Sequence, residues 1–287
     1  MTQKRNTLLV WLRAIAILMI VTVHTWSLSH IDSTVHPVLA LCYRLFHQCG
    51  APLFVMISGA LQLSSPIPSS RRYYKKRYVR ILVPFLFWSV IVYLLSCAAG
   101  KYADVQSIWD IISCYFPYLL TNRINEAYWF MGLIIVLYGI TPFLQRALAP
   151  CSRKGLILIC LAWLCFVVVR GFFPSFYLLQ YTSRLTYFLG FYILGYLLYR
   201  EWGEVWQPQT NKVVEAVSNC SFMTYLMHMI FITPLYTLVG FNGAQAPLWQ
   251  CMLLPIATSV IVVMTCTGIA LALKWIFPTT HRYLGIN

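Results

Sequence analysis

An arginine and a histidine lie inside the first long apolar stretch of the chain, WLRAIAILMIVTVHTW, which contains Arg13 and His24. His24 lies eleven positions after Arg13. Eleven steps of ~100° make almost three helical turns, so both side chains share one face, ~16 Å apart along the axis. A permanent cation and a titratable imidazole on one face indicate a polar path through a helix bundle. The alternative is a snorkelling arginine and a histidine hydrogen-bonded to a neighbouring helix.

The basic segment SSRRYYKKRYVRILVP contains a second candidate pair, Arg77 and Arg80. Two arginines three residues apart on a helix lie on one face and can hold a phosphate through bidentate hydrogen bonds. The alternative is charge that sets topology and contacts lipid headgroups. The spacing alone favours the alternative.

The stretch CGAPLFVMISGALQL contains Pro52, which we expect to interrupt a helix, and the pair Ser58-Gly59, which would let another backbone approach closely. This pattern is consistent with a kinked wall around a cavity, lined by Ser58. It is equally consistent with simple helix packing.

Two further sites stand in apolar surroundings. The pair Tyr128-Trp129 precedes a long apolar run, where an aromatic belt at the membrane boundary is the default explanation and Trp129 is a candidate for the substrate cavity. His228, in SFMTYLMHMIF, is either a packing histidine with satisfied hydrogen bonds or a further residue of that cavity.

Other reaction chemistries find no support in the sequence. It contains no GxSxG elbow, Walker loop or HExxH motif, and no acidic pair of the kind that glycosidases use. The ten cysteines lie mostly inside apolar runs and form no CxxC pair. We therefore expect free, packed thiols and no metal site.

The elements that must position these residues cross a membrane. Of the 287 residues 60% are hydrophobic and 10% are charged, whereas soluble domains carry roughly 25% charged residues. The net charge of +14 could suggest a nucleic-acid partner. The cations, however, stand in short segments between apolar runs, as in cytoplasmic loops, so we expect membrane lipids and no nucleic acid as partners.

The apolar runs predict eight transmembrane helices in an all-α bundle that forms a single membrane-embedded domain over residues 1–287. The runs are Leu8–Ser29, Val38–Leu63, Ile81–Ala99, Ala127–Leu144, Leu156–Phe173, Leu185–Tyr199, Phe222–Val239 and Leu248–Phe277. A further piece, Ile108–Leu120, is too short to span and contains Pro117. We expect it to be re-entrant or interfacial.

The distribution of cations predicts the orientation. With a cytoplasmic N-terminus and eight spans, fifteen loop cations lie inside, and only Lys101, Arg123, Arg170 and Arg184 lie outside. This asymmetry predicts that both chain ends are cytoplasmic.

Taken in order, the motifs resemble those of acyltransferase family 3, bacterial membrane proteins that O-acylate cell-surface polysaccharides. The matching elements are Arg13-x10-His24, GAPLFVMISG, Arg77-x-x-Arg80 with ILVPFLFW, YWFMGLIIVLYGITPF and SFMTYLMH. Together they cover roughly residues 8–199 and 218–277. The chain looks most similar to short members without an appended soluble domain, of the type that O-acetylates enterobacterial common antigen.

This resemblance implies a multi-pass protein of the bacterial inner membrane. It implies that Arg13 and His24 form the catalytic pair and that Arg77 and Arg80 bind the donor, a cytoplasmic acyl-CoA such as acetyl-CoA. The acceptor would be a hydroxyl of a surface glycan or lipid-linked saccharide. A homo-oligomer is compatible with the sequence.

The chain departs from the family pattern at two points. It shows eight spans where members usually have about ten, and apolar residues around Ile134 where some members carry a glutamate. Two other functions therefore stay open. One is a permease or flippase for a small polar or glycan-linked solute, with Arg13 and His24 along its path, and the other is a partner protein without catalysis.

Overall fold

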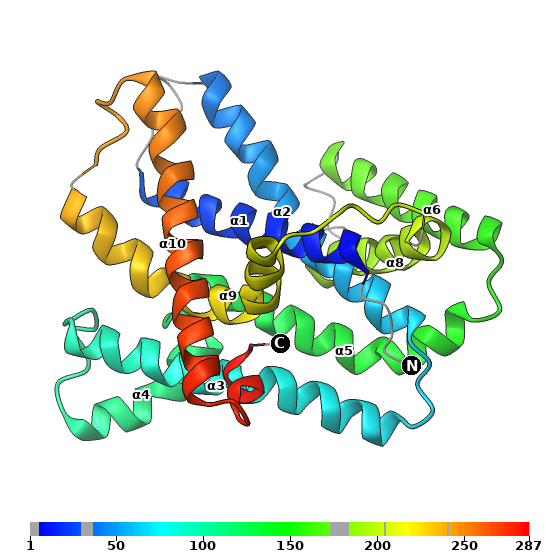
Figure 1. Ribbon diagram of the computed structural model, residues 1–287, viewed down its shortest axis with the longest axis horizontal. Coiled ribbons are helices and arrows are strands. Elements are labelled where there is room, and N and C mark those ends of the chain that lie inside the picture. Colours follow the sequence, from blue (N-terminus) through cyan, green and yellow to red (C-terminus); the bar gives the residue numbers. More distant parts are fainter. Residues whose placement is uncertain (1–5, 30–36, 173–183, 204, 240, 287) are drawn as a thin grey trace. The chain divides into compact units, whose positions relative to one another are not determined.

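The computed structural model describes residues 6–29, 37–172, 184–203, 205–239 and 241–286, and it is helical over most of these ranges (Figure 1). The longer helices are α1 (Thr7–Leu28), α2 (Pro37–Ser64), α3 (Ser70–Ala98), α5 (Trp129–Leu148), α6 (Arg153–Phe172), α8 (Arg184–Trp202), α9 (Lys212–Val239) and α10 (Leu248–Ile276). The shorter ones are α4 (Ile108–Leu120), η1 (Glu126–Tyr128) and η2 (His281–Leu284).

The helical class is confirmed, since the described part of each predicted apolar run is helical over nearly all its length and the described ranges contain no strand. Phe173, the last residue of one predicted run, lies outside the described residues. Five segments are long and apolar enough to cross a membrane: Thr7–Leu28, Ser70–Ala98, Glu126–Leu148, Lys212–Tyr236 and Leu248–Ile276. The protein is therefore a membrane protein. The runs predicted within α2, α6 and α8 are helical as well, and the count of eight spans stays a prediction.

Proline lies inside several of these helices without ending them. The expectation that Pro52 interrupts its helix is wrong, because α2 runs without a break from Pro37 to Ser64. Pro84 in α3 and Pro255 in α10 are likewise internal. Proline removes one backbone hydrogen bond, which neighbouring helices and hydroxyl side chains can compensate inside a membrane protein.

The short helix α4 has the bounds that the sequence predicts, Ile108–Leu120. It begins at a capping box, in which the Ser107 hydroxyl accepts a hydrogen bond from the Asp110 backbone and the Asp110 carboxylate accepts one from the Ser107 backbone. With 13 residues the helix is too short to cross a membrane. Its apolar residues Ile108, Trp109 and Leu120 are exposed. An exposed apolar side on a short helix is typical of an interfacial position.

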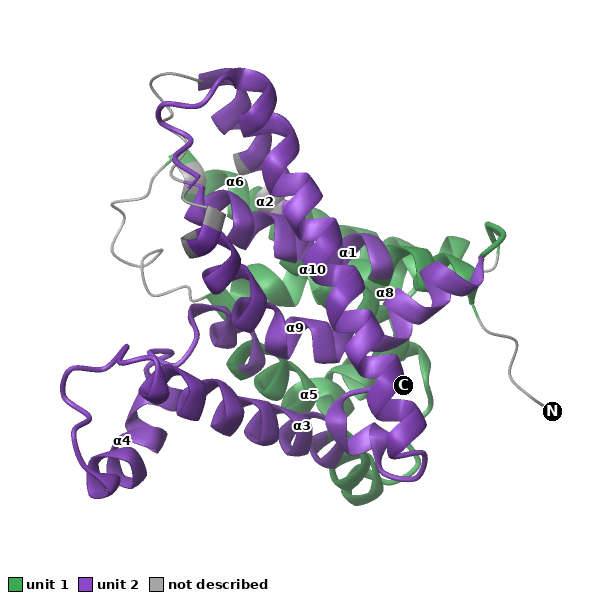
Figure 2. Cartoon of the chain, turned by 60° about the vertical axis from the view of Figure 1, so that its left-hand side comes forward, with its two compact units in different colours: residues 1–13, 51–77, 132–210 green, residues 14–50, 78–131, 211–287 purple. Residues whose placement is uncertain are grey.

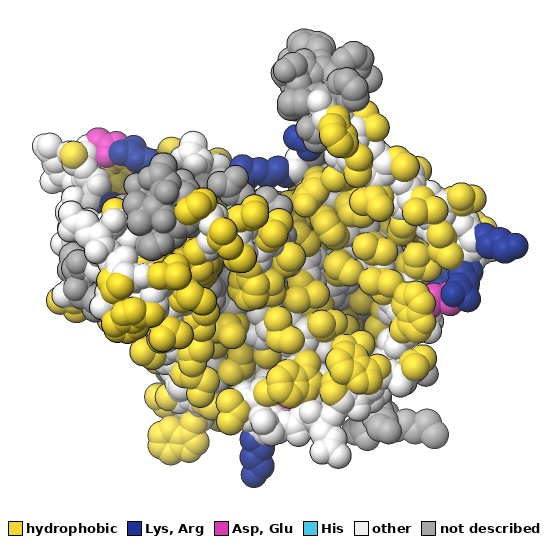
Figure 3. Space-filling model, turned by 90° about the horizontal axis from the view of Figure 1, so that it is seen from above, with side chains coloured by type: hydrophobic (Ala, Val, Ile, Leu, Met, Phe, Trp, Pro, Cys, Tyr) yellow, Lys and Arg dark blue, Asp and Glu magenta, His cyan; other side chains and the backbone are white. Residues whose placement is uncertain are grey.

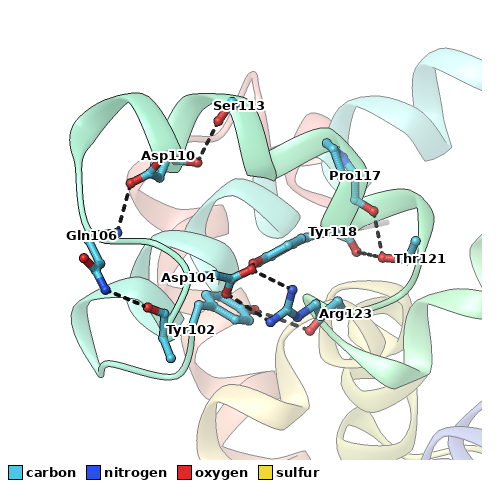
Figure 4. A network of polar contacts seen from close by, with 10 residues as sticks. Tyr102, Asp104, Gln106, Asp110, Ser113, Pro117, Tyr118, Thr121 and Arg123 are labelled. Atoms are coloured by element: carbon cyan, nitrogen blue, oxygen red, sulfur yellow. Dashed lines mark hydrogen bonds and ion pairs between the residues drawn. The ribbon is translucent and has the colours of Figure 1, made fainter.

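The segment that flanks α4 is fixed by a polar network (Figure 4). The guanidinium of Arg123 donates two hydrogen bonds of 3.0 Å to the carboxylate of Asp104. The Tyr118 hydroxyl donates to the same carboxylate, and the guanidinium carbon of Arg123 lies 4.2 Å from the centre of the Tyr118 ring. This network joins the residues before α4 to those after it.

The chain forms two compact units, each assembled from several separate segments (Figure 2). Unit 1 comprises residues 1–13, 51–77 and 132–210. In it α6 packs against α8, and α2 packs closely on α8 as well. The fully buried Tyr192 hydrogen-bonds the Thr141 hydroxyl at 2.8 Å and so joins α8 to α5.

Unit 2 comprises residues 14–50, 78–131 and 211–287, and its main contact is that of α9 with α10. Its fully buried side chains include Ile17, Met223 and Leu226. The segment after α10 returns to the unit, where Trp88 donates to the Leu284 carbonyl at 3.1 Å and Ile286 is buried. Gly285, with φ of 89°, makes the turn that permits this packing.

Large apolar side chains also cover the outside of the long helices. On α10 they include Leu253, Ile256 and Ile261, and on α3 they include Val83 and Leu94. Hydrophobic side chains dominate the face seen in Figure 3, with lysine and arginine at its margins. A surface this apolar is suited to contact with lipid.

Candidate functional site

His24 lies on the part of α1 that belongs to unit 2, and the residue after it, Thr25, fixes this helix against α10. The buried Thr25 hydroxyl lies 2.9 Å from the Ser259 hydroxyl and donates to the Pro255 carbonyl at 3.0 Å. Buried hydroxyls that share hydrogen bonds between two helices fix their rotation and depth. The position of His24 is therefore set by its neighbour on the helix.

The ring of His24 faces that of His228 on α9. The centres of the two imidazole rings are 5.0 Å apart, with the ring planes tilted by 46°. His24 is half-buried, whereas His228 is fully buried. The two histidines that the sequence shows as separate candidates thus form one pair in unit 2.

The hydrogen bonds of His228 define its chemical form. Its Nδ1 lies 2.7 Å from the backbone carbonyl oxygen of Tyr225. A carbonyl only accepts, so Nδ1 carries the proton and Nε2 of the neutral ring presents a lone pair. This Nε2 is buried and hydrogen-bonds no residue in the described part of the chain. A basic nitrogen with an unused lone pair therefore lies beside His24.

The turn of α9 before His228 is braced against the residues that precede α5. The Tyr225 hydroxyl donates to the carbonyl of Ala127, and the Tyr128 hydroxyl donates to the carbonyl of Leu226 at 3.2 Å. We call these two hydrogen bonds the tyrosine brace. Because both tyrosines are buried, the brace fixes α9 at the level of the histidine pair.

The brace also corrects the expectation for the aromatic pair before α5. Tyr128 is only 2% exposed, and its ring packs edge-on against that of Phe85, with 5.1 Å between the ring centres. It therefore does not belong to a belt facing lipid. Trp129 is half-buried and packs edge-on against Phe130 at 5.8 Å. Trp129 stays a predicted cavity residue.

Arg13 and Ser58 belong to unit 1 rather than to the unit of the histidine pair. Arg13 lies on α1, and Ser58 lies half-buried on α2. The close approach predicted beside Ser58 is present, because a Cβ atom on Gly59 would overlap the backbone of Tyr192 on α8. Ser58 thus borders a tight contact between helices.

The two arginines of the basic segment lie on the first three turns of α3, which begins at Ser70. Arg77 is half-buried and its guanidinium carbon lies 5.8 Å from the centre of the Tyr73 ring. Arg80 is exposed. A cation within about 6 Å of an aromatic ring centre is attracted to the ring, so Tyr73 contributes to holding the guanidinium of Arg77.

Sequence reasoning missed the residues that connect the site. Thr25, Tyr225 and Ser259 are ordinary in composition, and no spacing rule links them. One signal was present: His24 is 17 residues beyond the start of α1 and His228 is 16 residues beyond the start of α9. At ~1.5 Å per residue both lie ~25 Å along their helices, so similar depth could have suggested the pair.

A cavity of about 230 Å³ lies in unit 1 between α6 and α8. Its walls are apolar and include Ile159, Trp163, Phe166 and Leu189. It contains none of the predicted site residues. Within the described ranges, no three His, Cys, Asp or Glu side chains gather as a metal would require.

A family model matches most of the chain. The family model described as an acyltransferase domain, of acyltransferase family 3, matches residues 8–205, more than half of the chain. The matched range includes Arg13, His24, Arg77 and Arg80, and it ends before His228. No curated protein and no solved structure matches the chain.

Proposed function

The chain belongs to acyltransferase family 3, and from this we propose that it is an O-acyltransferase of the bacterial inner membrane. It moves an acyl group, in the first instance acetyl, from cytoplasmic acetyl-CoA to a hydroxyl of a surface or lipid-linked glycan. Enterobacterial common antigen is one such acceptor. The observation that carries the proposal is the family match together with the pairing of His24 with a neutral histidine.

The donor end of the reaction requires binding of CoA phosphates. Arg77 and Arg80 are three residues apart on α3, so their side chains lie on one face of the helix. Guanidinium groups bind phosphate through two parallel hydrogen bonds. We assign both arginines to the CoA moiety.

The acceptor end requires a base. In this proposal His24 takes the proton of the acceptor hydroxyl as its oxygen attacks the thioester carbonyl carbon. The new C–O bond forms, the C–S bond breaks, and CoA leaves as the thiol after receiving that proton. Arg13 is assigned to the catalytic pair from the resemblance to the family, and at ~16 Å along the helix from His24 its charge lies away from the reacting carbonyl.

A permease or flippase is the competing function, and acetyl-CoA separates the two. Calorimetric titration of the purified protein with acetyl-CoA should show binding by wild type, His24→Ala and His24→Gln alike. Glycan acetylation should be lost in both variants, because neither side chain takes up a proton. A general base contributes typically 10²–10⁴-fold.

The control is His281→Gln, because His281 lies outside the spans and hydrogen-bonds a backbone carbonyl as His228 does. This variant should acetylate glycan normally. Absence of acetyl-CoA binding to the wild type would favour the permease. Normal acetylation by His24→Gln would keep the enzyme but remove His24 as its base.

A further inference from the structure

Two buried polar atoms on α9, one of them on the histidine that faces His24, have no hydrogen-bond partner among the described residues. One is Nε2 of His228, and the other is Oγ1 of Thr224. Both residues are fully buried. Buried polar atoms are rarely left without hydrogen bonds. A ligand that binds at these two atoms would explain why no residue satisfies them.

The two atoms belong to one place on α9. Thr224 precedes His228 by four residues, which is about 40° around the helix and about 6 Å along it. The Tyr225 carbonyl holds Nδ1 of His228, so this ring is oriented by the helix itself. The ring of the half-buried His24 lies 5.0 Å from that of His228.

The chemistry of the two atoms is complementary. Nε2 of the neutral imidazole can only accept a hydrogen bond, while the threonine hydroxyl can donate one. A group that satisfies both must donate and accept at once. A hydroxyl does so with a single oxygen atom, whereas a carboxylate cannot donate and an ammonium group cannot accept.

We propose that His228 and Thr224 bind a hydroxyl of the acceptor that is not acylated, next to the hydroxyl that His24 deprotonates. This deepens the proposed function and rests on it. The acceptor class is then a polyol, such as a sugar ring with neighbouring hydroxyls. His228 is a binding residue for the acceptor, and the tyrosine brace keeps its helix in place.

Two pairs of variants test this assignment. His228→Gln places an amide oxygen near the position of Nε2, whereas His228→Asn keeps only the donor near Nδ1 that holds the Tyr225 carbonyl. Thr224→Ser keeps the hydroxyl, and Thr224→Val removes it at nearly constant volume. Each full-length variant is first titrated with acetyl-CoA, and binding like that of the wild type establishes that it is folded.

The measurement is transfer from radiolabelled acetyl-CoA to lipid-linked saccharide extracted from the host membrane, added in increasing amounts. We expect the apparent KM for the saccharide to rise roughly tenfold or more in His228→Asn and Thr224→Val, as for loss of a buried hydrogen bond. It should stay closer to the wild-type value in His228→Gln and Thr224→Ser, with kcat little changed throughout.

The outcomes separate this inference from the proposed function. If the wild type transfers no acetyl group to the saccharide, the proposed O-acyltransferase function is refuted, and this inference is refuted with it. If the wild type transfers acetyl groups and the apparent KM for the saccharide is the same in His228→Asn as in His228→Gln, His228 serves only to hold the Tyr225 carbonyl. A collapse of kcat with unchanged KM would mean that His228 meets the reacting hydroxyl. If the His228 variants fail to bind acetyl-CoA, equal KM in Thr224→Val and Thr224→Ser overturns the inference.

Discussion

Gly59 on α2 lies directly against the backbone carbonyl of Tyr192 on α8, so closely that no side chain fits between the helices. A second contact of the same kind joins the two helices, because a Cβ on Gly195 of α8 would overlap the backbone of Met56 on α2. Small residues that let backbones approach are a main source of association between membrane helices. Unit 1 depends on this contact for the placement of α2.

Gly59→Ala should therefore destabilise unit 1. Overpacking a tight contact costs typically 1–3 kcal/mol, because backbone must move to accept the methyl group. Thermal unfolding in detergent micelles measures the effect. Gly132→Ala and Gly268→Ala are matched controls, since a Cβ at either helical position meets no atom within 4 Å. These two should be neutral or slightly stabilising, and an equal loss in all three would contradict the close contact.

Arg77→Ala and Arg80→Ala should weaken acetyl-CoA binding. Hydrogen bonds to charged groups contribute ~1.5–3 kcal/mol, so the dissociation constant should rise by roughly one to two orders of magnitude. Arg77→Lys should recover only part of the affinity, because lysine keeps the charge but neither the fork nor the stacking on Tyr73. Calorimetric titration measures all three.

Arg71 and Arg72 provide the comparison for these arginines, since both are exposed on the same helix. Replacing either with alanine should change acetyl-CoA affinity much less. Equal losses at all four positions would instead indicate general attraction to anions or lipid headgroups.

The network beside α4 should respond to alkaline pH. Burial of the phenol, and then its hydrogen bond to the Asp104 carboxylate, raise the pKa of Tyr118 from its ordinary 10.0 to about 12. The folded state thus holds this proton more tightly than the unfolded state. The resulting stabilisation is complete below pH 10 and is lost as the pH rises towards about 12.

Asp104→Asn should lower the pKa of Tyr118 towards 10 without reaching it, because burial of the phenol remains. Ultraviolet titration of tyrosinate, taken as the difference between each protein and its Tyr118→Phe counterpart, isolates this group. An unchanged titration in Asp104→Asn would show that the carboxylate does not hold the proton.

Topology can be measured with reporter fusions. The expected signals are inside after Leu63, outside after Gly100, inside after Arg146 and inside after Asn287. If only the five segments named above as long and apolar enough crossed the membrane, the count would be odd and the two chain ends would lie on opposite sides. An outside signal after Asn287 would therefore contradict the prediction of eight spans.

Composition and run length were sufficient to predict the helical class, and the bounds of α4 follow from its capping serine and its apolar length. Pro52 misled the prediction because in a membrane bundle a proline can be accommodated within a continuous helix. Tyr128 misled it because an aromatic residue near a helix end has the same local sequence whether it faces lipid or a partner helix. Only the contact with Leu226 distinguishes the two.

The candidate site, like the fold, could be predicted from the sequence only in part. His24 and the two arginines of α3 could be chosen from their own surroundings, since charge in apolar sequence is costly. The pairing with His228 could not, because residues of α1 and α9 are some two hundred positions apart and no local pattern encodes their contact. The fixed tautomer of His228 likewise depends on a backbone carbonyl, which sequence does not reveal.

The tyrosine brace also determines when during synthesis the site can exist. Each of its two hydrogen bonds joins residues 98 positions apart. The residues on α9, Tyr225 and Leu226, are translated together with His228 after the whole segment that the family model matches. A nascent chain that has inserted only the earlier helices has His24 and the arginines of α3 but lacks both the brace and the second histidine. Maturation of the histidine pair is thus coupled to insertion of α9.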